Sequence, residues 1–159
     1  MAPTDGDGDG DAGALLLRPA GPDDADRVAD VHLASRAAAP MPPTAHPDAE
    51  VRAWLARRLV LDETWVAEVA GEVVGYLRMT ATWLDDLYVL PAHAGRGVGS
   101  ALVEVAKARR PDGFSLWVFA VNAPARTFYA RHGLVEREHT DGRDNEEREP
   151  DLRMAWEPG

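Results

Sequence analysis

Residues 83–110 read WLDDLYVLPAHAGRGVGSALVEVAKARR and predict, in order, a strand, a glycine loop and a helix. Leucine and valine favour the strand as far as Pro91, which cannot donate to a ladder. Glycines at 95, 97 and 99 permit a tight turn and let a ligand approach the main chain. From Ser100 apolar residues recur at helical spacing, and cations fill the last turn. A glycine loop that opens a helix presents free N–H groups at the positive end of the helix dipole, so this stretch predicts an anion site, usually for phosphate.

Three kinds of phosphate loop compete for this stretch. A P-loop requires a lysine after the final glycine, and a dinucleotide fingerprint requires a glycine where Ser100 stands, so both fail. Residues 88–102, Tyr-Val-x-Pro-x-x-x-Gly-x-Gly-x-Gly-Ser-x-Leu, instead resemble the central motif of the GNAT superfamily of acetyl-CoA-dependent N-acetyltransferases. A loop that merely packs a helix on a strand remains the structural alternative.

A second segment strengthens this resemblance. Residues 122–133, Asn-Ala-Pro-Ala-Arg-Thr-Phe-Tyr-Ala-Arg-His-Gly, are similar to the family's Asn-to-Tyr segment, although Leu134 replaces its usual phenylalanine. Two motifs in the right order discriminate better than either alone. The resemblance implies the GNAT-like acyl-CoA N-acyltransferase fold, an α/β fold with a mixed sheet.

The rest of the chain predicts elements in the order β-α-α-β-β-β-α-β-α-β-β. Apolar runs and turn residues predict strands at 15–20, 65–69, 73–79, 84–90, 114–119, 134–139 and 152–156. Helical periods follow Asp24, Asp48, Ser100 and Asn122. The first strands form an antiparallel meander, whereas the later alternation of strand and helix favours partly parallel strands.

Length and composition predict one domain, residues 15–159, behind a disordered acidic tail, residues 1–14. The tail matches half of a calcium loop, but Leu16 stands where a bidentate carboxylate is needed, so calcium is rejected. The chain has no cysteine, which excludes disulfides and thiolate metal sites. It has no membrane-spanning apolar run and no signal-peptide layout, so we expect a cytoplasmic protein and no membrane partner.

The resemblance implies roles for particular residues. The main chain of Leu87, Tyr88 and Val89 would hold the pantetheine arm and acetyl carbonyl, and Asn122 would bond the same arm. Tyr129 would protonate the leaving thiolate as general acid, which a phenol can do at neutral pH; packing in the core is its alternative. The pyrophosphate would bind the loop residues Ala94, Gly95, Arg96, Gly97, Val98, Gly99 and Ser100.

Two departures from the family pattern matter. Ala94 stands where the loop usually begins with Arg or Gln, so one side-chain contact to phosphate is lost, and Arg96 could replace part of its charge. Trp117 stands where ribosomal-protein acetyltransferases of the family carry a glutamate, which argues against protein N-terminal acetylation by that mechanism.

The general base is left open. Asp85 and Asp86 are adjacent on the central strand, so regular alternation points their side chains to opposite faces. Asp85 is preferred slightly, Asp86 is the alternative, and a water relay to a more distant group is equally allowed. The five histidines are scattered singly and are expected at the surface or in caps.

Charge bears on the acceptor. The net charge is −10, of which the four aspartates of residues 5–11 contribute −4. Residues 140–151 contribute another −4, from six acids and two arginines. In the family this second segment borders the acceptor cleft, so its acidity favours a cationic amine as acceptor, carried by a small molecule or by a peptide. The alternative is that these charges only keep the protein soluble. The absence of a basic stripe argues against nucleic acid.

Three functions follow from these observations. The first is an N-acetyltransferase that uses acetyl-CoA and no metal, as a monomer or homodimer. The second is a non-catalytic acyl-CoA-binding or sensor module on the same fold, and the third is a nucleotide-binding protein with an unrelated ligand in the glycine loop.

Overall fold

The computed structural model describes residues 13–159. The predicted acidic tail, residues 1–14, lies outside this range apart from Gly13 and Ala14, so its boundary stays a prediction. Within the range, seven strands and four α-helices follow one another in the predicted order, which is confirmed.

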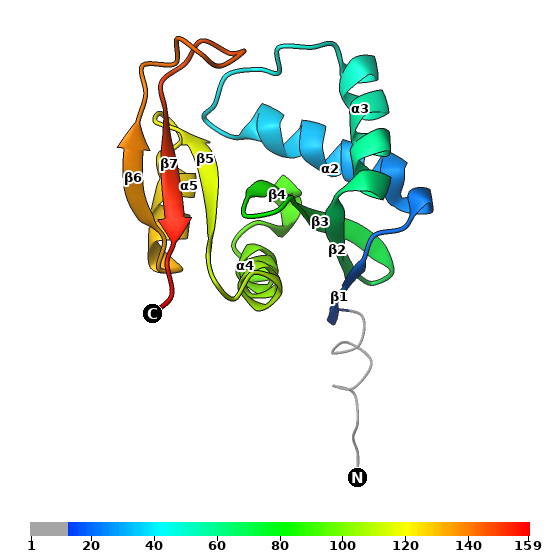
Figure 1. Cartoon of the computed structure of the whole chain (residues 1–159). Coiled ribbons are helices and arrows are strands. Elements are labelled where there is room, and N and C mark those ends of the chain that lie inside the picture. Colours follow the sequence, from blue (N-terminus) through cyan, green and yellow to red (C-terminus); the bar gives the residue numbers. More distant parts are fainter. Residues whose placement is uncertain (1–12) are drawn as a thin grey trace.

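The strands form two sheets, of four and three strands, in the orders β1-β2-β3-β4 and β5-β7-β6 (Figure 1). Every ladder is antiparallel. The strand–helix–strand segment makes β5 and β6 run in the same direction, as expected, although β7 inserts between them and pairs antiparallel with both. The strands are β1 (Leu15–Pro19), β2 (Glu63–Val69), β3 (Glu72–Met79), β4 (Leu84–Val89), β5 (Phe114–Phe119), β6 (Val135–His139) and β7 (Asp151–Trp156).

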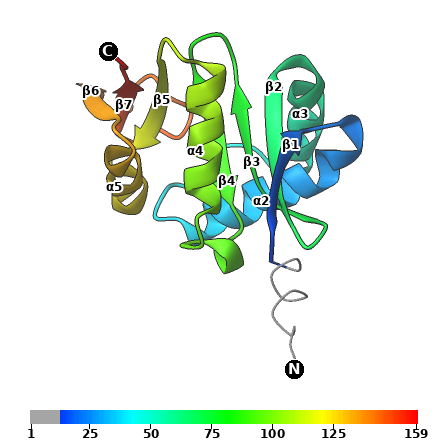
Figure 2. The same ribbon diagram turned by 90° about the horizontal axis from the view of Figure 1, so that it is seen from below.

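Helices cover both faces of the larger sheet. Figures 1 and 2 show α2 and α3 on one face and α4 on the other, with α5 beside the smaller sheet. A two-residue turn at Ala70 and Gly71, both with positive φ, joins β2 to β3 and continues the predicted antiparallel meander. The helices are α2 (Ala25–Ala38), α3 (Asp48–Leu61), α4 (Val98–Arg109) and α5 (Ala123–Arg131).

The main core lies between the larger sheet, α4 and the smaller sheet. Its fully buried members include Leu77, Leu102, Leu152 and Met154, so both sheets share one apolar interior. Gly75 on β3 brings α4 close, because a Cβ there would lie 3.1 Å from Val98 Cγ1. This close approach sets the glycine loop, which precedes α4, directly beside the end of β4.

The two sheets meet at one point and then separate. A single parallel bridge joins Trp83 to Ser115, and Ser115 N–H donates to the Thr82 carbonyl at 3.0 Å. The indole rings of Trp83 and Trp117 stack there, with centroids 6.0 Å apart. Beyond this point no ladder in residues 13–159 joins β4 to β5, so one edge of β4 faces an opening.

Candidate active site

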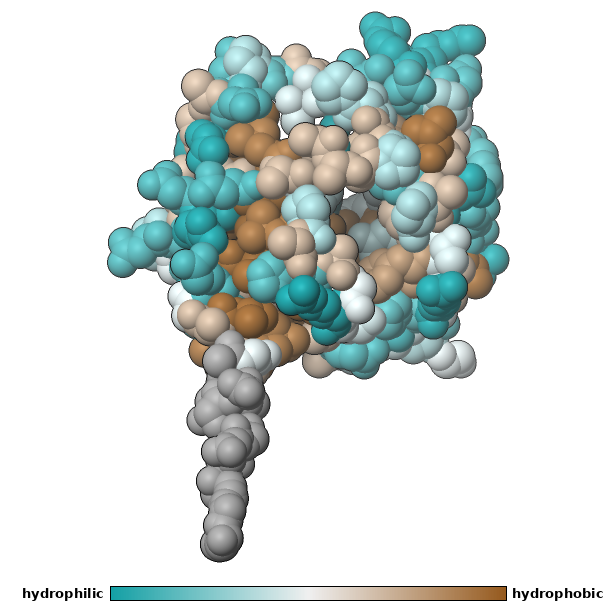
Figure 3. Space-filling model, turned by 180° about the vertical axis from the view of Figure 1, so that it is seen from behind, coloured by the Kyte–Doolittle hydropathy of each residue, from teal (hydrophilic) through white to brown (hydrophobic). Residues whose placement is uncertain are grey.

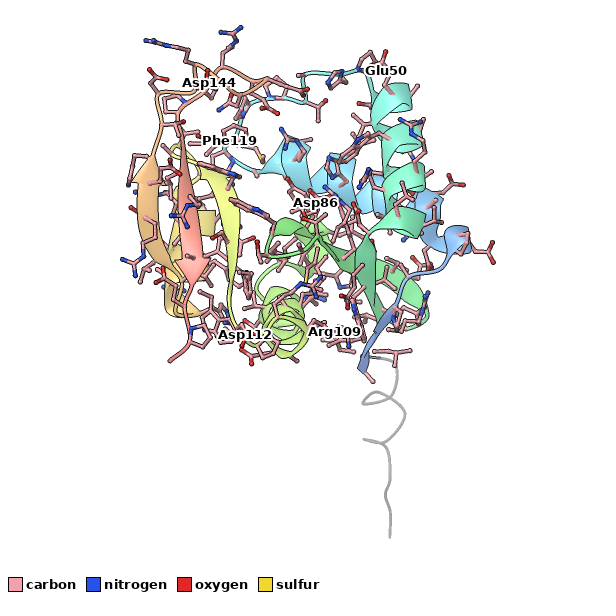
Figure 4. The ribbon with its side chains drawn as sticks, viewed as in Figure 1. Glu50, Asp86, Arg109, Asp112, Phe119 and Asp144 are labelled. Atoms are coloured by element: carbon pink, nitrogen blue, oxygen red, sulfur yellow. The ribbon has the colours of Figure 1, made fainter. Side chains whose placement is uncertain are left out.

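A cleft of about 1240 Å³ occupies the opening between β4 and β5. Figure 4 shows Asp86 at its centre between the sheets, with Phe119 on the smaller sheet and Glu50 at the start of α3 on the opposite side. The space-filling view from behind shows a hollow that passes between the two halves (Figure 3). The glycine loop, β4, β5, α2 and α5 all contribute lining residues.

The open edge of β4 supplies main-chain groups to this cleft. Leu90 N–H donates to the Val74 carbonyl at 2.8 Å. Because hydrogen-bonded and non-hydrogen-bonded pairs alternate along an antiparallel ladder, the main-chain N–H and C=O groups of Tyr88 point toward β3, and those of Leu87 and Val89 point away from it. The Val89 carbonyl accepts a hydrogen bond of 2.7 Å from the Ser35 hydroxyl of α2. The predicted triplet is therefore divided: Leu87 and Val89 turn main-chain groups to the opening, whereas Tyr88 lines the cleft with its side chain.

The glycine loop forms a row of free donors at one end of the cleft. Gly95 and Gly97 have φ of 75° and 86°, the left-handed region that favours glycine, and a Cβ at either would meet nothing within 4 Å. Within residues 13–159 no hydrogen bond uses the main-chain N–H groups from Gly95 to Ser100. The loop opens the twelve-residue helix α4, so these donors lie at the positive end of its dipole. An anion with several oxygen atoms fits this cradle.

Side chains of the loop play smaller parts. Ala94 and Arg96 are exposed, and Arg96 makes no hydrogen bond or ion pair with another described residue. The Ser100 hydroxyl lies 3.0 Å from His132 Nε2 at the end of α5, so the loop is attached to that helix. His132 was expected in a cap, and its link to Ser100 was not predicted.

Helix α5 presents Asn122 and Tyr129 to the same cleft. Asn122 caps the helix by accepting from Ala125 N–H at 3.3 Å, which leaves its amide nitrogen without a partner among the described residues. The Tyr129 hydroxyl also makes no hydrogen bond within residues 13–159. In that range Arg36 Nε is the one side-chain polar atom of the non-exposed residues that has neither a hydrogen-bond partner nor access to solvent. The Tyr129 hydroxyl, which has no partner, is therefore accessible to solvent. Burial raises the pKa of Tyr129, so the phenol keeps its proton at neutral pH.

Comparison with known proteins agrees with this geometry. Residues 61–136 match the family model described as an acetyltransferase (GNAT) domain. Over these residues the chain is similar to the GNAT superfamily. An uncharacterized N-acetyltransferase of Methanocaldococcus jannaschii is 34% identical over 104 residues, which cover 56% of this chain and 46% of the relative. A peptidyl-lysine N-acetyltransferase of Escherichia coli is 33% identical over 73 residues, which cover 45% of this chain and 49% of the relative.

These alignments span about half the length of each curated relative. Solved structures extend the likeness in fold to nearly the whole chain. The PaiA N-acetyltransferase from Thermoplasma acidophilum, in complex with coenzyme A, superposes with a TM-score of 0.69 at 16% identity, covering 91% of this chain and 99% of that one. The GNAT fold is therefore established for this chain.

A β-bulge corrects the prediction for the two aspartates. Met79 pairs with Leu84 and Arg78 pairs with Asp86, so Asp85 is an extra residue in β4. Regular alternation does not hold across a bulge, so it cannot assign the two side chains to opposite faces, and both residues line the cleft.

The two carboxylates differ in their partners. Asp85 is exposed at the cleft surface and accepts from the Thr80 hydroxyl at 2.8 Å, while the surrounding protein raises its pKa by desolvation. Asp86 is buried and accepts from Arg78 Nε at 2.8 Å. Arg78 also donates to Asp62 at 2.7 Å, so Asp86 belongs to a buried ionic network.

His32 on α2 overturns the expectation of surface or capping roles for the histidines. It is only 7% exposed, lines the cleft and has Nδ1 2.8 Å from the Tyr76 hydroxyl. Tyr76 in turn donates to Asp86 Oδ2 at 3.1 Å. A signal for this burial was present in the sequence, because His32 falls in the helical period of Val28 and Val31.

The acidic segment 140–151 borders the cleft, as the family pattern implies, but part of its charge is paired. Glu146 lies 3.0 Å from His46 Nε2, and Glu147 lies 3.8 Å from Arg36 Nη2. These contacts connect the segment to the loop that follows α2, through His46, and to α2 itself, through Arg36. Asp85 and Asp86 on β4 also line the cleft.

Two further observations concern membrane spans and metal sites among the described residues. No helix within residues 13–159 is long and apolar enough to cross a membrane. In the same range no three His, Asp or Glu side chains gather as a metal site would require.

Proposed function

We propose that this protein is an N-acetyltransferase that moves an acetyl group from acetyl-CoA directly to a primary amine. The observation that carries the proposal is the continuity of one cleft. Its floor is the open edge of β4 at Leu87 and Val89, its end is the N–H row from Gly95 to Ser100, and its wall holds the unpaired hydroxyl of Tyr129.

Residues of the cleft suit two parts of the coenzyme, its pyrophosphate and its pantetheine arm. The free N–H groups of the glycine loop suit a pyrophosphate, because oriented donors at a helix N-terminus favour anions. Main-chain groups of Leu87 and Val89 can bond amide groups of an extended arm, as an added strand would. The free amide nitrogen of Asn122 can bond the same arm. Acetyl-CoA supplies the activated acyl group when it is bound.

Two proton movements are required of the chain. Tyr129 would give its proton to the sulfur as the C–S bond breaks, and the raised pKa keeps that proton in place beforehand. The acceptor amine must lose a proton before it can attack. Asp85 is the candidate base favoured by the sequence, and its raised pKa improves it as a proton acceptor. A group that acts through water is the alternative.

The acceptor that suits the cleft is a cationic amine. Asp85 and Asp86 place two carboxylates at the centre of the cleft, and Trp54 and Trp117 add aromatic surface to its walls. Carboxylates attract an ammonium group, and aromatic faces attract cations. The E. coli relative is named for a peptidyl-lysine acceptor, so both small amines and lysine peptides belong in the proposal. The oligomeric state, monomer or homodimer, and residence in the cytoplasm stay predictions.

The test combines binding with transfer. We expect saturating acetyl-CoA to raise the melting temperature, since a ligand at about 100 times its Kd stabilises the folded state by about 2.7 kcal/mol. We then expect release of free thiol when a panel of polyamines, aryl amines and lysine peptides is added. Stabilisation without thiol release from any amine would indicate the sensor module. No stabilisation at all would indicate the nucleotide-binding alternative and refute the proposal.

A further inference from the structure

Three side chains form a hydrogen-bonded chain that ends in the cleft. His32 Nδ1 lies 2.8 Å from the Tyr76 hydroxyl, and the Tyr76 hydroxyl lies 3.1 Å from Asp86 Oδ2. The three residues come from α2, β3 and β4, and each is buried. The chain of bonds therefore crosses three elements and is held by the packing of all of them.

The direction of these hydrogen bonds fixes the tautomer of His32. Asp86 already accepts from Arg78 Nε at 2.8 Å and therefore acts as a carboxylate, so Tyr76 donates to it. The Tyr76 oxygen then accepts from His32, which places the imidazole proton on Nδ1. Nε2 is left with its lone pair.

Nε2 of His32 is available to a ligand. It makes no hydrogen bond within residues 13–159. It is also not enclosed by the protein, because Arg36 Nε is the one unpaired side-chain polar atom in that range that is shut off from solvent. An unpaired atom that is not sealed reaches solvent, and the solvent at His32 is that of the cleft, which this residue lines.

The ring also lies beside the strand that would hold the acyl group. The His32 ring meets the Tyr88 ring edge-on at a centroid distance of 4.9 Å, and Tyr88 stands between Leu87 and Val89. Ser35, one turn further along α2, bonds the Val89 carbonyl at 2.7 Å. Helix α2 is therefore fixed to β4 at the level where His32 enters the cleft.

The charges around His32 suit a neutral imidazole that can become positive. Burial lowers its pKa, and Arg36 on α2 and Arg78 on β3 lower it further, so the ring is neutral at neutral pH. The negative charge of Asp86 on β4 raises the pKa of His32, because it stabilises the protonated ring. The remaining titratable groups that face it are Tyr76 and Tyr88, and burial raises the pKa of each phenol, so both stay uncharged.

We infer that His32 is the general base of the proposed transfer, with Nε2 taking a proton from the acceptor ammonium and with Tyr76 and Asp86 as positioning residues. This inference rests on the proposed function. The amine nitrogen, freed of one proton, uses its lone pair to form the N–C bond as the C–S bond breaks onto sulfur. The ammonium loses two protons in all. His32 takes one and passes it to solvent. The other returns Tyr129 to its protonated form after Tyr129 has given its own proton to the thiolate. Asp85 then serves to attract the ammonium group.

The first test needs no substrate. Nitrogen-15 NMR of the imidazoles, with His32 assigned by the loss of its signals in His32→Asn, reports the tautomer and the midpoint of titration. We expect the proton on Nδ1 and a midpoint below the ordinary value of 6.5. In Tyr76→Phe the tautomer preference should be lost, because the acceptor for Nδ1 is gone. A proton on Nε2 of the unmodified protein would overturn the inference.

The second test is kinetic. His32→Asn keeps an amide N–H near the position of Nδ1 and removes Nε2, so it preserves the bond to Tyr76 while removing the base. We expect kcat to fall by about two to four orders of magnitude, with unchanged acetyl-CoA affinity by calorimetry. The acidic limb of the parent pH profile should disappear. His139→Asn is the matched control, because His139 is exposed on β6 and does not line the cleft.

The outcomes separate the two proposals. If the parent transfers acetyl groups and His32→Asn retains turnover within about threefold with the same acidic limb, His32 is not the base and the acetyltransferase function stands. If the parent binds acetyl-CoA but acetylates no amine, the proposed function fails and the general-base role fails with it.

Discussion

The Ser35 hydroxyl donates a hydrogen bond of 2.7 Å to the main-chain carbonyl of Val89, across 54 residues of sequence. This bond satisfies a carbonyl that would otherwise face the opening between the sheets. It also ties α2, the helix that carries His32, to the open edge of β4.

Removal of this bond should loosen α2. We expect Ser35→Ala to lower the free energy of unfolding by about 1 kcal/mol, since the Val89 carbonyl loses its partner. Ser35→Thr keeps a hydroxyl and is the control. Urea denaturation of both variants measures the difference, and equal stability of Ser35→Ala and the parent would show that water replaces the hydroxyl.

Gly97 offers a direct test of the anion cradle. Gly97→Ala should lower stability by about 1 kcal/mol, because an alanine at a φ of 86° is strained, and should also weaken acetyl-CoA binding. Gly71→Ala is a matched control, since Gly71 has a φ of 79°, equally open surroundings and a place in the β2–β3 turn. The two variants should lose similar stability, and a similar loss of affinity in both would refute a cradle at Gly97.

Ala94 tests whether the loop has lost a phosphate contact. Ala94→Arg should tighten acetyl-CoA binding by about 1 kcal/mol, the net value of a charge-assisted bond at an exposed site. Ala130→Arg adds the same charge on an exposed position of α5 and should leave the affinity unchanged. Calorimetry that finds equal affinity for Ala94→Arg and the parent would mean that the main-chain donors and Arg96 already saturate the phosphates.

Tyr129→Phe separates chemistry from packing. The variant keeps the ring and loses one proton, so turnover should fall by about two to four orders of magnitude while acetyl-CoA affinity changes little. The measurement is single-turnover kinetics on a confirmed amine. Turnover within about threefold of the parent would leave Tyr129 as a wall of the cleft, with water protonating the thiolate.

Acid should weaken the buried ionic network. The hydrogen bond from Arg58 lowers the pKa of Asp62, so the folded carboxyl binds its proton less readily than the unfolded one. Its contribution to stability is therefore complete above the ordinary value of 3.8 and is lost as the pH falls through the lower folded value. Asp62→Asn should cost about 3 kcal/mol at neutral pH, and the cost should shrink progressively as the pH falls below 3.8. Denaturant unfolding across this pH range checks this, with the exposed Asp26→Asn as control.

The sequence predicted what depends on local pattern. The order of elements, the antiparallel meander of the first strands and the glycine loop all follow from periodicity and turn residues close in the chain, and the resemblance to the GNAT superfamily followed from two short motifs. The roles assigned to Tyr129 and to the loop residues stay predictions.

Other features depend on contacts that no local pattern encodes. The bulge at Asp85 shifts a register that regular alternation cannot anticipate. The bond between His32 and Tyr76 spans 44 residues, and the contact between His46 and Glu146 spans 100. A lone histidine carries no signal of such a partner, although a polar residue on the apolar face of a helix does indicate a buried contact.

The open edge of β4 also bears on how the chain avoids aggregation during folding. An unpaired strand edge is a template for any other strand, and β4 keeps such an edge. Each sheet is built from its own half of the chain, so the edge is fully exposed until the second half has folded. In the folded protein, residues of β5, α2 and the glycine loop surround this edge, and the Ser35 hydroxyl bonds the Val89 carbonyl. The geometry that admits a ligand to the backbone is thus also what keeps neighbouring molecules from pairing with it.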